Sequence, residues 1–214
     1  GADVTVQLAA LARDPQLAQP HPQAGRRDPQ PRGGCLDVTG PGVDDVGAFA
    51  GVDLIVSDAA GCTAHLKEYG HWAEGGDEMQ TRVRDVTELV AELIAEGALP
   101  SFPMDRGDVA VQDPCHLRHA QRILAAPRDI VRAAGWRPVE IDPDGLCCGA
   151  AGIYSLLHPD ASHELGTRKA EQVMATSATT VVSANPGCEM QLRSHLGPSH
   201  RVVHPVELYH SSLQ

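Results

Sequence analysis

Short apolar runs alternate along this sequence with longer amphipathic segments, and this alternation limits the folds that the chain can adopt. The runs expected to form β-strands are 52–58, 108–113, 137–142 and 179–185. The segments expected to form helices are 62–69, 87–96, 118–124, 127–134, 159–175, 188–196 and 205–212. Such alternation is typical of α/β proteins, whose strands pair mostly in parallel. Because the run 52–58 is almost continuously apolar, we expect this strand to be buried on both faces.

An internal repeat indicates that part of this α/β unit occurs twice. VDLIVSDAAGCTAHL (52–66) aligns with ATTVVSANPGCEMQL (178–192) at a constant offset of 178 − 52 = 126 residues. The identical pairs are Val56/Val182, Ser57/Ser183, Gly61/Gly187, Cys62/Cys188 and Leu66/Leu192. At this offset Cys147 and Cys148 fall on His21 and Pro22, and Cys115 falls before the first residue. The N-terminal copy is therefore expected to be incomplete.

The first part of the chain has a different composition. Residues 14–34 are rich in Pro, Gln, Arg and Gly and show no apolar period, which favours a loop or disorder. A frame-shifted or spliced segment is one hypothesis for this composition. We expect three regions: 1–50, a poorly ordered remnant of the first repeat; 51–105, the rest of that repeat; and 106–214, a second, complete repeat.

Charge and hydropathy exclude several classes of protein. The formal net charge of 17 − 28 = −11 argues against a general nucleic-acid binder and against docking on anionic lipid through a basic patch. No run of about 18 apolar residues is present to span a bilayer. Residues 1–13 do not resemble a signal peptide, and the missing initiator Met suggests a fragment or a processed product.

The cysteines carry the chemical information. Six cysteines, at 35, 62, 115, 147, 148 and 188, are too sparse for a disulfide scaffold in a chain of 214 residues, whereas clustered cysteines indicate a metal or a catalytic site. Cys115, the pair Cys147–Cys148, and Cys188 each follow the carboxyl end of an expected strand. The numbers of residues between them are 31 and 39, about one strand and one helix each time. Ligands collect at these strand ends in open α/β sheets, so the four sulfurs can meet there.

Residues next to these cysteines suit a metal centre. Pro186 and Gly187 begin an expected helix at Cys188, where free N–H groups favour a thiolate. The small residues Gly149–Gly152 allow backbone amides to approach an inorganic core. Thiolates suit both iron–sulfur clusters and zinc, and a count of four cysteines does not choose between them.

Other candidate residues have simpler interpretations. An isolated Cys35 is expected to be a small buried side chain. His116 and His119 are either ligands, proton carriers or surface residues, and a nucleophilic Cys115–His116 pair is disfavoured because sequence neighbours point apart on a strand or turn. We expect no catalytic residue. Asp85 and Glu88 are expected to cap the helix that begins near residue 87.

Three motifs carry a resemblance to a known family. DPCH (113–116), LCCGAAG (146–152) and ANPGC (184–188) resemble the cysteine-rich CCG domain shared by heterodisulfide reductase, lactate-utilisation iron–sulfur proteins and the glycolate oxidase iron–sulfur subunit. Gln191 stands where the heterodisulfide reductase form has a further cysteine, as in the glycolate oxidase form. The fold implied is α/β, with two tandem CCG-type repeats, short and mostly parallel sheets, and an incomplete N-terminal repeat.

The resemblance also implies a site and a function. The residues that it assigns to the cofactor are Cys115, Cys147, Cys148, Cys188, Gly149, Gln191 and Cys62, with the first four as metal ligands. The cofactor would be an iron–sulfur cluster, either 4Fe-4S or noncubane, with zinc as the alternative. The implied protein is the electron-transfer subunit of a glycolate (2-hydroxy-acid) dehydrogenase, an oxidoreductase of glyoxylate metabolism.

The implied partners are flavin-containing subunits and a quinone acceptor. The implied location is the cytoplasm or the inner face of the membrane, without a transmembrane segment. The alternatives are a structural zinc or subunit-docking module, a thiol redox protein like heterodisulfide reductase, and a degenerate chain that binds nothing.

Overall fold

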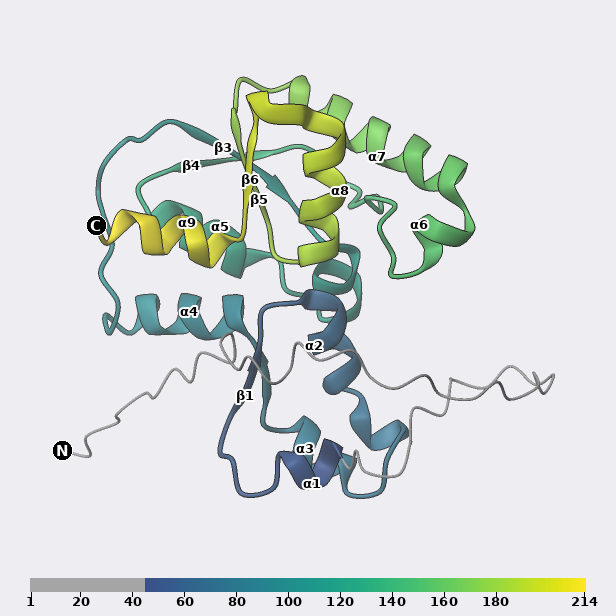
Figure 1. Ribbon diagram of the computed structural model, residues 1–214. Coiled ribbons are helices and arrows are strands. Elements are labelled where there is room, and N and C mark those ends of the chain that lie inside the picture. Colours follow the sequence, from purple (N-terminus) through teal and green to yellow (C-terminus); the bar gives the residue numbers. More distant parts are fainter. Residues whose placement is uncertain (1–44) are drawn as a thin grey trace, which may run out of the picture. The chain divides into compact units, whose positions relative to one another are not determined.

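The structure, a computed structural model, describes residues 45–214 (Figure 1). The segment 14–34, Cys35 and most of the remnant expected over 1–50 lie outside these residues. The division expected between residues 105 and 106 stays a prediction.

A four-stranded parallel sheet forms the larger half of the described chain. Its strands, in spatial order, are β4 (Arg137–Glu140), β3 (Asp108–Gln112), β5 (Thr180–Ser183) and β6 (Arg201–Val203). In the register, Val109 lies opposite Pro138 of β4 on one side and Thr180 of β5 on the other. Every pairing in this sheet is parallel, so the strands all end at the same edge.

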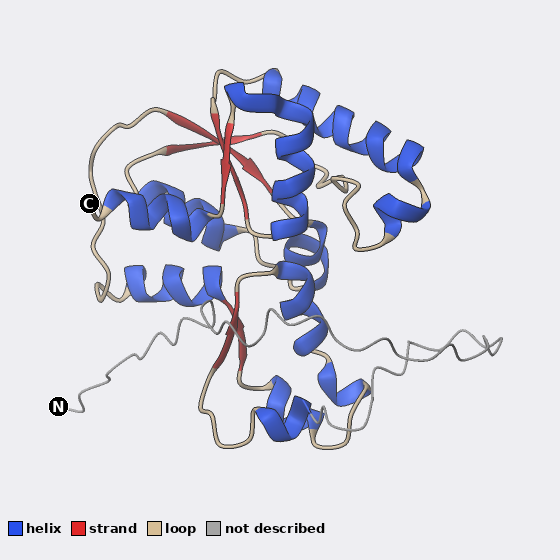
Figure 2. Ribbon diagram, viewed as in Figure 1, coloured by secondary structure: helices blue, strands red, loops and turns tan. Residues whose placement is uncertain are grey.

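Helices cover both faces of this sheet (Figure 2). On one face Ala110 and Val181 pack with side chains of α7 (Pro159–Met174) and α8 (Pro186–Leu196). On the other face Val109, Val111 and Val182 pack with α5 (Ala125–Ala133) and α9 (Pro205–Ser212). Successive residues of a strand point to opposite faces, and this is why an unbroken apolar run is needed to fill both layers.

A smaller sheet lies in the first half of the described chain. It pairs β1 (Ile55–Ser57) in parallel with β2 (Val83–Asp85), and Ile55, Met79 and Val83 form its core. Its helices are α2 (Ala60–Leu66), α3 (Gly76–Gln80) and α4 (Val86–Ala95). The short elements of the described chain are α1 (Asp45–Ala48), η2 (Tyr69–His71), η3 (His116–Ala120), α6 (Tyr154–Leu157) and η4 (Gly197–Ser199).

The expectation that residues 52–58 are buried on both faces is wrong. Val52, Leu54 and Val56 are 39%, 44% and 41% exposed. Among the described residues β1 pairs only with β2, and one face of this two-stranded sheet is left without a covering layer. An apolar run therefore predicted the strand correctly but not its environment.

The repeat extends further in the structure than in the sequence. β1 followed by α2 matches β5 followed by α8, and each pair is continued by a second parallel strand and a helix, β2 with α4 and β6 with α9. Both of these later helices begin with a capping box, Asp85 with Glu88 and His204 with Glu207. The expected α/β class with short, mostly parallel sheets is confirmed. The incomplete first repeat stays a prediction.

The two halves are joined through helix packing. Val90, Ala91 and Ile94 of α4 contact a buried cluster made by α5 and α9. Lys67, just after α2, forms an ion pair with Glu88 of α4. Within residues 45–214, none of the helices has the length and hydropathy needed to cross a bilayer.

His204 makes the stability of α9 dependent on pH. Its Nδ1 accepts the N–H of Val206 at 3.2 Å, which requires an unprotonated Nδ1, and burial lowers the pKa of the ring below its ordinary value of 6.5. The unfolded chain therefore takes up this proton at higher pH than the folded chain. Stability that is present above pH 6.5 is consequently lost as the pH falls below that value.

We expect the free energy of unfolding, measured by urea titration, to fall more steeply between pH 7 and 5 in the wild type than in His204→Asn. Asparagine keeps a capping acceptor without titrating. The control is His210→Asn, which changes an exposed histidine of the same helix and should follow the wild type. Parallel pH profiles for all three chains would contradict this assignment.

Candidate metal centre

Three loops at the carboxyl edge of the larger sheet carry the four cysteines singled out by the sequence. Cys115 follows β3, Cys147 and Cys148 lie in the loop after β4, and Cys188 lies in the first turn of α8, after β5. Because β3 lies between β4 and β5, these loops are neighbours in space. The prediction that strand order brings the four cysteines to one edge agrees with this arrangement.

The four thiols interact as one group. The Sγ atoms of Cys148 and Cys188 are 2.9 Å apart, and both side chains are buried. The thiols of Cys115 and Cys148 both lower the pKa of the neighbouring Cys147 sulfur. Cys115 and Cys147 are only partly buried. The group therefore runs from the protein surface into the interior.

The neighbouring thiols shift the pKa values of the four sulfurs in opposite directions. The pKa of Cys147 is lowered, first by the thiol of Cys115 and then by that of Cys148, and the pKa of Cys188 is lowered by the thiol of Cys148 against the effect of burial. The pKa of Cys115 is raised, first by Cys147 and then by burial, and that of Cys148 is raised by Cys147, by Cys188 and by burial. Metal binding would displace the remaining thiol protons.

Two N–H donors also point at the sulfurs. The backbone N–H of Gly149 donates to Cys147 at 3.3 Å, and the side-chain amide of Asn185 donates to Cys188 at 3.5 Å. The side-chain oxygen of Asn185 (Oδ1) accepts a hydrogen bond from the backbone N–H of Gly61, at the start of α2. Donors of this kind stabilise thiolate charge and tune a metal centre.

Cys62 occupies a different position from the other four. It is exposed on α2, next to Gly61, and is not one of the four interacting thiols described above. As the repeat counterpart of Cys188, it begins a similar helix after a similar strand. Its expected role at the cofactor stays a prediction.

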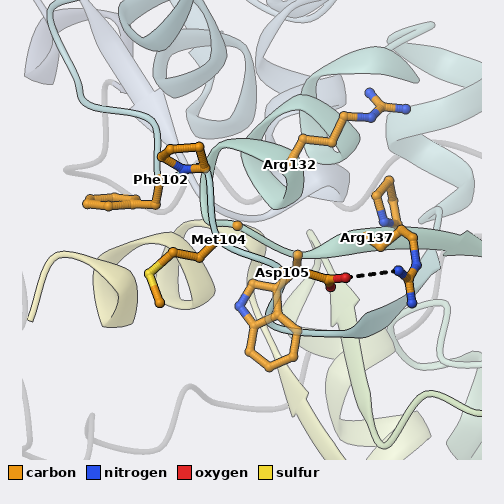
Figure 3. Close-up of a pocket in the computed structure, with 9 residues that line it drawn as sticks. Phe102, Met104, Asp105, Arg132 and Arg137 are labelled. Atoms are coloured by element: carbon orange, nitrogen blue, oxygen red, sulfur yellow. Dashed lines mark hydrogen bonds and ion pairs between the residues drawn. The ribbon is translucent and has the colours of Figure 1, made fainter.

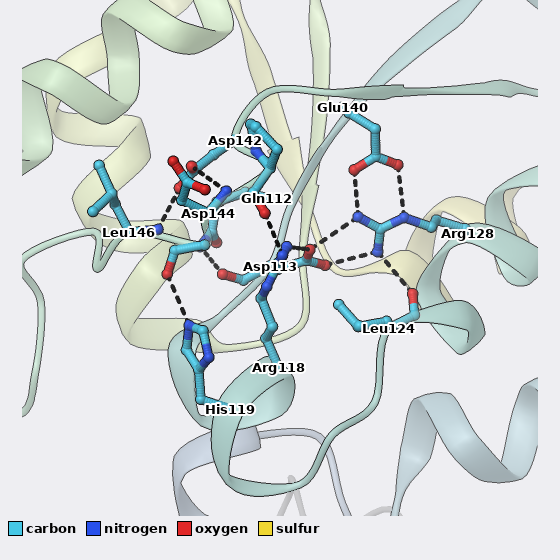
Figure 4. A network of polar contacts seen from close by, with 12 residues as sticks. Gln112, Asp113, Arg118, His119, Leu124, Arg128, Glu140, Asp142, Asp144 and Leu146 are labelled. Atoms are coloured by element: carbon cyan, nitrogen blue, oxygen red, sulfur yellow. Dashed lines mark hydrogen bonds and ion pairs between the residues drawn. The ribbon is translucent and has the colours of Figure 1, made fainter.

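A polar network holds the loops of Cys115 and Cys147 together (Figure 4). The buried carboxylate of Asp113 accepts hydrogen bonds from Arg118 at 3.0 Å and from Arg128 at 2.8 and 2.9 Å. Arg118 also donates to the carbonyl of Pro143, in the loop after β4. The guanidinium group of Arg118 thus connects Asp113, two residues before Cys115, to the loop that leads to Cys147.

The turn before Cys147 has its own support. The Asp142 carboxylate accepts the N–H groups of Asp144 and Leu146, and His119 contacts the carbonyl oxygen of Gly145 at 3.2 Å. Sequence reasoning did not single out Arg118, Arg128 or Asp142. The charged residues were visible, but the contacts of Arg118 with Asp113 and Pro143, and of Arg128 with Asp113, span 5 to 25 residues and are made only by the fold.

The two histidines near Cys115 differ in their contacts. His116 Nδ1 lies 3.6 Å from the Cys115 sulfur, so the expectation that these side chains point apart is wrong. Cys115 has helical backbone angles before the π-helical turn η3, not the strand or extended turn that was assumed. The raised pKa of Cys115 nevertheless argues against a nucleophilic pair. His119 contacts the backbone carbonyl oxygen of Gly145, in the loop after β4.

Gly149 and Gln191 meet at α7. Gly149 has φ +87°, and a Cβ there would lie 2.6 Å from the carbonyl oxygen of Ser162. The Ser162 hydroxyl donates to the Gly149 carbonyl at 2.9 Å, and the Gln191 amide donates to the Ser162 carbonyl at 3.0 Å. Gln191 thus supports the Cys-Cys-Gly turn through Ser162. Its direct role at the cofactor stays a prediction.

The sulfurs of Cys148 and Cys188 are closer together than two ligands of one metal ion would be. Tetrahedral thiolates at 2.3 Å from zinc are separated by about 3.8 Å, whereas these two sulfurs are 2.9 Å apart. In the described part of the chain, no three His, Cys, Asp or Glu side chains are arranged around a single ion position. A metal centre would therefore spread this pair of thiols apart.

A cavity of about 380 Å³ lies at the opposite end of the sheet (Figure 3). Asp105 and Arg137 flank it before β3 and at the start of β4, and they form an ion pair at 3.3 Å. Phe102, Met104 and Trp136 supply its apolar wall. It contains no cysteine and is separate from the thiol group.

Comparison with known proteins agrees with this arrangement. Residues 109–193 match the family described as "Cysteine-rich domain" (CCG). The matched segment contains all four cysteines of the group.

The chain is similar to the glycolate oxidase iron–sulfur subunit of Escherichia coli (32% identity, 77% of this chain, 41% of the relative) and to the probable subunit of Bacillus subtilis (30%, 73% and 38%). A fumarate reductase (CoM/CoB) subunit of Methanothermobacter marburgensis is also similar (29%, 91% and 39%). The resemblance expected from the motifs is confirmed, and the chain spans about two fifths of the length of these relatives.

Gly149→Ala should disrupt the Cys-Cys-Gly turn far more than Gly152→Ala. Both glycines have positive φ, which costs an L-residue about 1–2 kcal/mol, but a Cβ at Gly152 meets nothing within 4 Å. At Gly149 it meets the backbone of α7, which adds about 1–3 kcal/mol. Urea denaturation of the metal-free chains measures the difference. Equal losses of unfolding free energy in the two variants would refute the close approach to α7.

Proposed function

We propose that the chain is the electron-transfer part of an iron–sulfur oxidoreductase that oxidises glycolate or a related 2-hydroxy acid. The observation that carries the proposal is the continuous group of four thiols formed by three neighbouring loops of one sheet. A group of thiols is the donor set that iron–sulfur clusters and zinc prefer. The relatives named as iron–sulfur subunits support the cluster over zinc.

The residues present fit an iron–sulfur centre. Cys115, Cys147, Cys148 and Cys188 supply the sulfurs, and the Gly149 and Asn185 N–H groups already donate to two of them. The buried pair Cys148–Cys188 provides a site withdrawn from water, while the partly exposed Cys115 and Cys147 lie at the surface. This gradient of burial suits a group that exchanges electrons with a partner while most of it stays protected.

Each part of the chain has a definite task in this proposal. The four cysteines would hold the cluster, which when bound accepts and releases single electrons. Asp113, Arg118 and Asp142 fix the two loops so that the sulfurs start close together. Thiol protons must leave on loading, and the N–H groups of Gly149 and Asn185 stabilise the thiolates.

The wider role follows from the similarity to glycolate oxidase subunits. In the complete protein, flavin-containing subunits would take electrons from the hydroxy acid, and this chain would pass them towards a quinone. It would act in the cytoplasm or at the inner face of the membrane. Gln191 supports the glycolate oxidase form over a thiol reductase, because the further cysteine of the latter is replaced by an amide that Ser162 holds.

Replacement of Cys188 tests the proposal, with Cys62 as its matched control. Both residues follow Gly at the start of a helix after a short strand, but only Cys188 belongs to the thiol group. After anaerobic reconstitution, we expect iron and acid-labile sulfide in the wild type and in Cys62→Ser, and a loss of most of both in Cys188→Ser. A visible absorption that dithionite bleaches should follow the same order.

If the wild type bound zinc and contained no acid-labile sulfide, this result would instead support the alternative function, a structural zinc module. Equal iron and sulfide in all three chains would show that the centre lies elsewhere.

A further inference from the structure

Two histidines from neighbouring helices bring their ring nitrogens together outside the cysteine group. α7 and α8 pack against each other (Figure 1), and His163 of α7 lies beside His195 of α8. The two residues are 32 positions apart in the sequence, yet Nδ1 of His163 is 3.2 Å from Nε2 of His195. The ring centres are 5.1 Å apart. His163 is exposed and His195 is half-buried, so the pair lies at the surface of the protein.

A hydrogen bond on the other side of the His195 ring determines which nitrogen carries the proton. Nδ1 lies 2.8 Å from the backbone carbonyl oxygen of Gln191, which only accepts hydrogen bonds. The nearby hydroxyl of Ser194 donates to the same carbonyl at 2.8 Å, so its proton is already used. The proton of His195 is therefore on Nδ1, and Nε2 presents a lone pair towards His163. Histidines that bind metals are commonly held by a backbone carbonyl in this way.

A glycine of α7 makes room for the His195 ring. Gly166 lies three residues after His163, on the same face of the helix. A Cβ at Gly166 would lie 2.6 Å from Nε2 of His195. Gly166 has no positive φ, so the missing side chain is needed for space and not for backbone conformation. Glycine inside a helix costs about 1 kcal/mol relative to alanine, and α7 carries this cost where the imidazole packs against it.

The separation of the two nitrogens suits two ligands of one ion. Imidazole nitrogens at about 2.0–2.1 Å from a divalent ion are about 2.9 Å apart at a right angle and about 3.3 Å apart in a tetrahedron. The distance of 3.2 Å between His163 and His195 falls in this range. Without an ion, the N–H of His163 Nδ1 fills the same space as a hydrogen bond to His195. When an ion binds, the proton of His163 moves to Nε2 of its own ring, so the chain releases no proton.

We propose that His163 and His195 bind a divalent transition-metal ion such as Zn²⁺ or Ni²⁺, which connects α7 to α8. Imidazole suits these ions, whereas Ca²⁺ and Mg²⁺ require oxygen ligands. In the described part of the chain, no third His, Cys, Asp or Glu side chain joins the pair, so water completes the coordination.

The position of this ion relates it to the cysteine loops. Ser162, which donates to the Gly149 carbonyl, immediately precedes His163, and Gln191, which donates to Ser162, holds the ring of His195. The ion joins the two helices at the place where they support the Cys-Cys-Gly turn. The inference does not rest on the proposed function, because neither histidine is a ligand of the cysteine centre.

Zn²⁺ titration of the wild-type chain, followed by ¹H–¹⁵N NMR of the histidine rings at constant neutral pH, tests the assignment. The ring signals report on the histidines separately from any Zn²⁺ that the thiols bind. We expect the signals of His163 Nδ1 and His195 Nε2 to change together, while those of the exposed His158 and His210 stay in place. Signals of the pair that do not respond to Zn²⁺ would mean a hydrogen bond only and would overturn the proposal.

His195→Gln and Gly166→Ala remove the site in two different ways, and His158→Gln is the matched control. The first variant lacks one ligand, whereas the second keeps both and displaces the His195 ring. His158 is an exposed histidine immediately before α7. Affinity for Zn²⁺, measured from the ring signals of His163, should fall by about a hundredfold in both variants, because a second ligand held in place raises affinity by about this factor. His158→Gln should match the wild type.

Thermal unfolding verifies that the compared chains are folded, and His195→Gln decides the test if Gly166→Ala does not fold. Equal affinity in His195→Gln and the wild type would overturn the proposal. An equal loss in His158→Gln would also overturn it, because the Zn²⁺ would then be bound by several surface histidines and not by this pair.

Discussion

The parallel pairing of β3 with both β4 and β5 is the constraint on which the cysteine site depends. These three strands run in the same direction, so the loops that follow them leave the sheet at one edge, and each of those loops carries a cysteine element. Apolar side chains that alternate between the two faces hold the strands in this register. A register shift in β3 would move Cys115 away from Cys147 and would also exchange the two layers of the core.

Polar contacts then convert a shared edge into a single site. Asp113 and Arg118 connect the first loop to the second, and Asp142 braces the second loop and binds Lys169 of α7. Ser162 donates a hydrogen bond to Gly149 of the Cys-Cys-Gly turn, and Gln191 in turn donates one to Ser162. The thiols are the chemically active part, but their separation is set by carboxylates, guanidinium groups and amides that contact no metal. This arrangement explains how thiols from three separate loops come to interact with one another.

The sequence predicted the α/β class, four of the strands and the grouping of cysteines, because each depends on local patterns: apolar runs, and cysteines placed after them. It missed β2 and β6, which are three residues long and gain their stability from pairing with a neighbour. It assigned Val56 to a buried environment, because no local pattern reports a missing neighbouring layer. The ion pairs of Asp113 and Lys169 were equally hidden, since their partners are chosen by the fold.

Anomalous diffraction at the iron edge, from crystals of the anaerobically loaded chain, tests the central claim most directly. The account predicts iron density bonded to the sulfurs of Cys115, Cys147, Cys148 and Cys188, at the carboxyl edge where β3, β4 and β5 end. Iron bound only at surface histidines, or four thiols that stay in mutual contact without metal in crystals of the loaded chain, would contradict it.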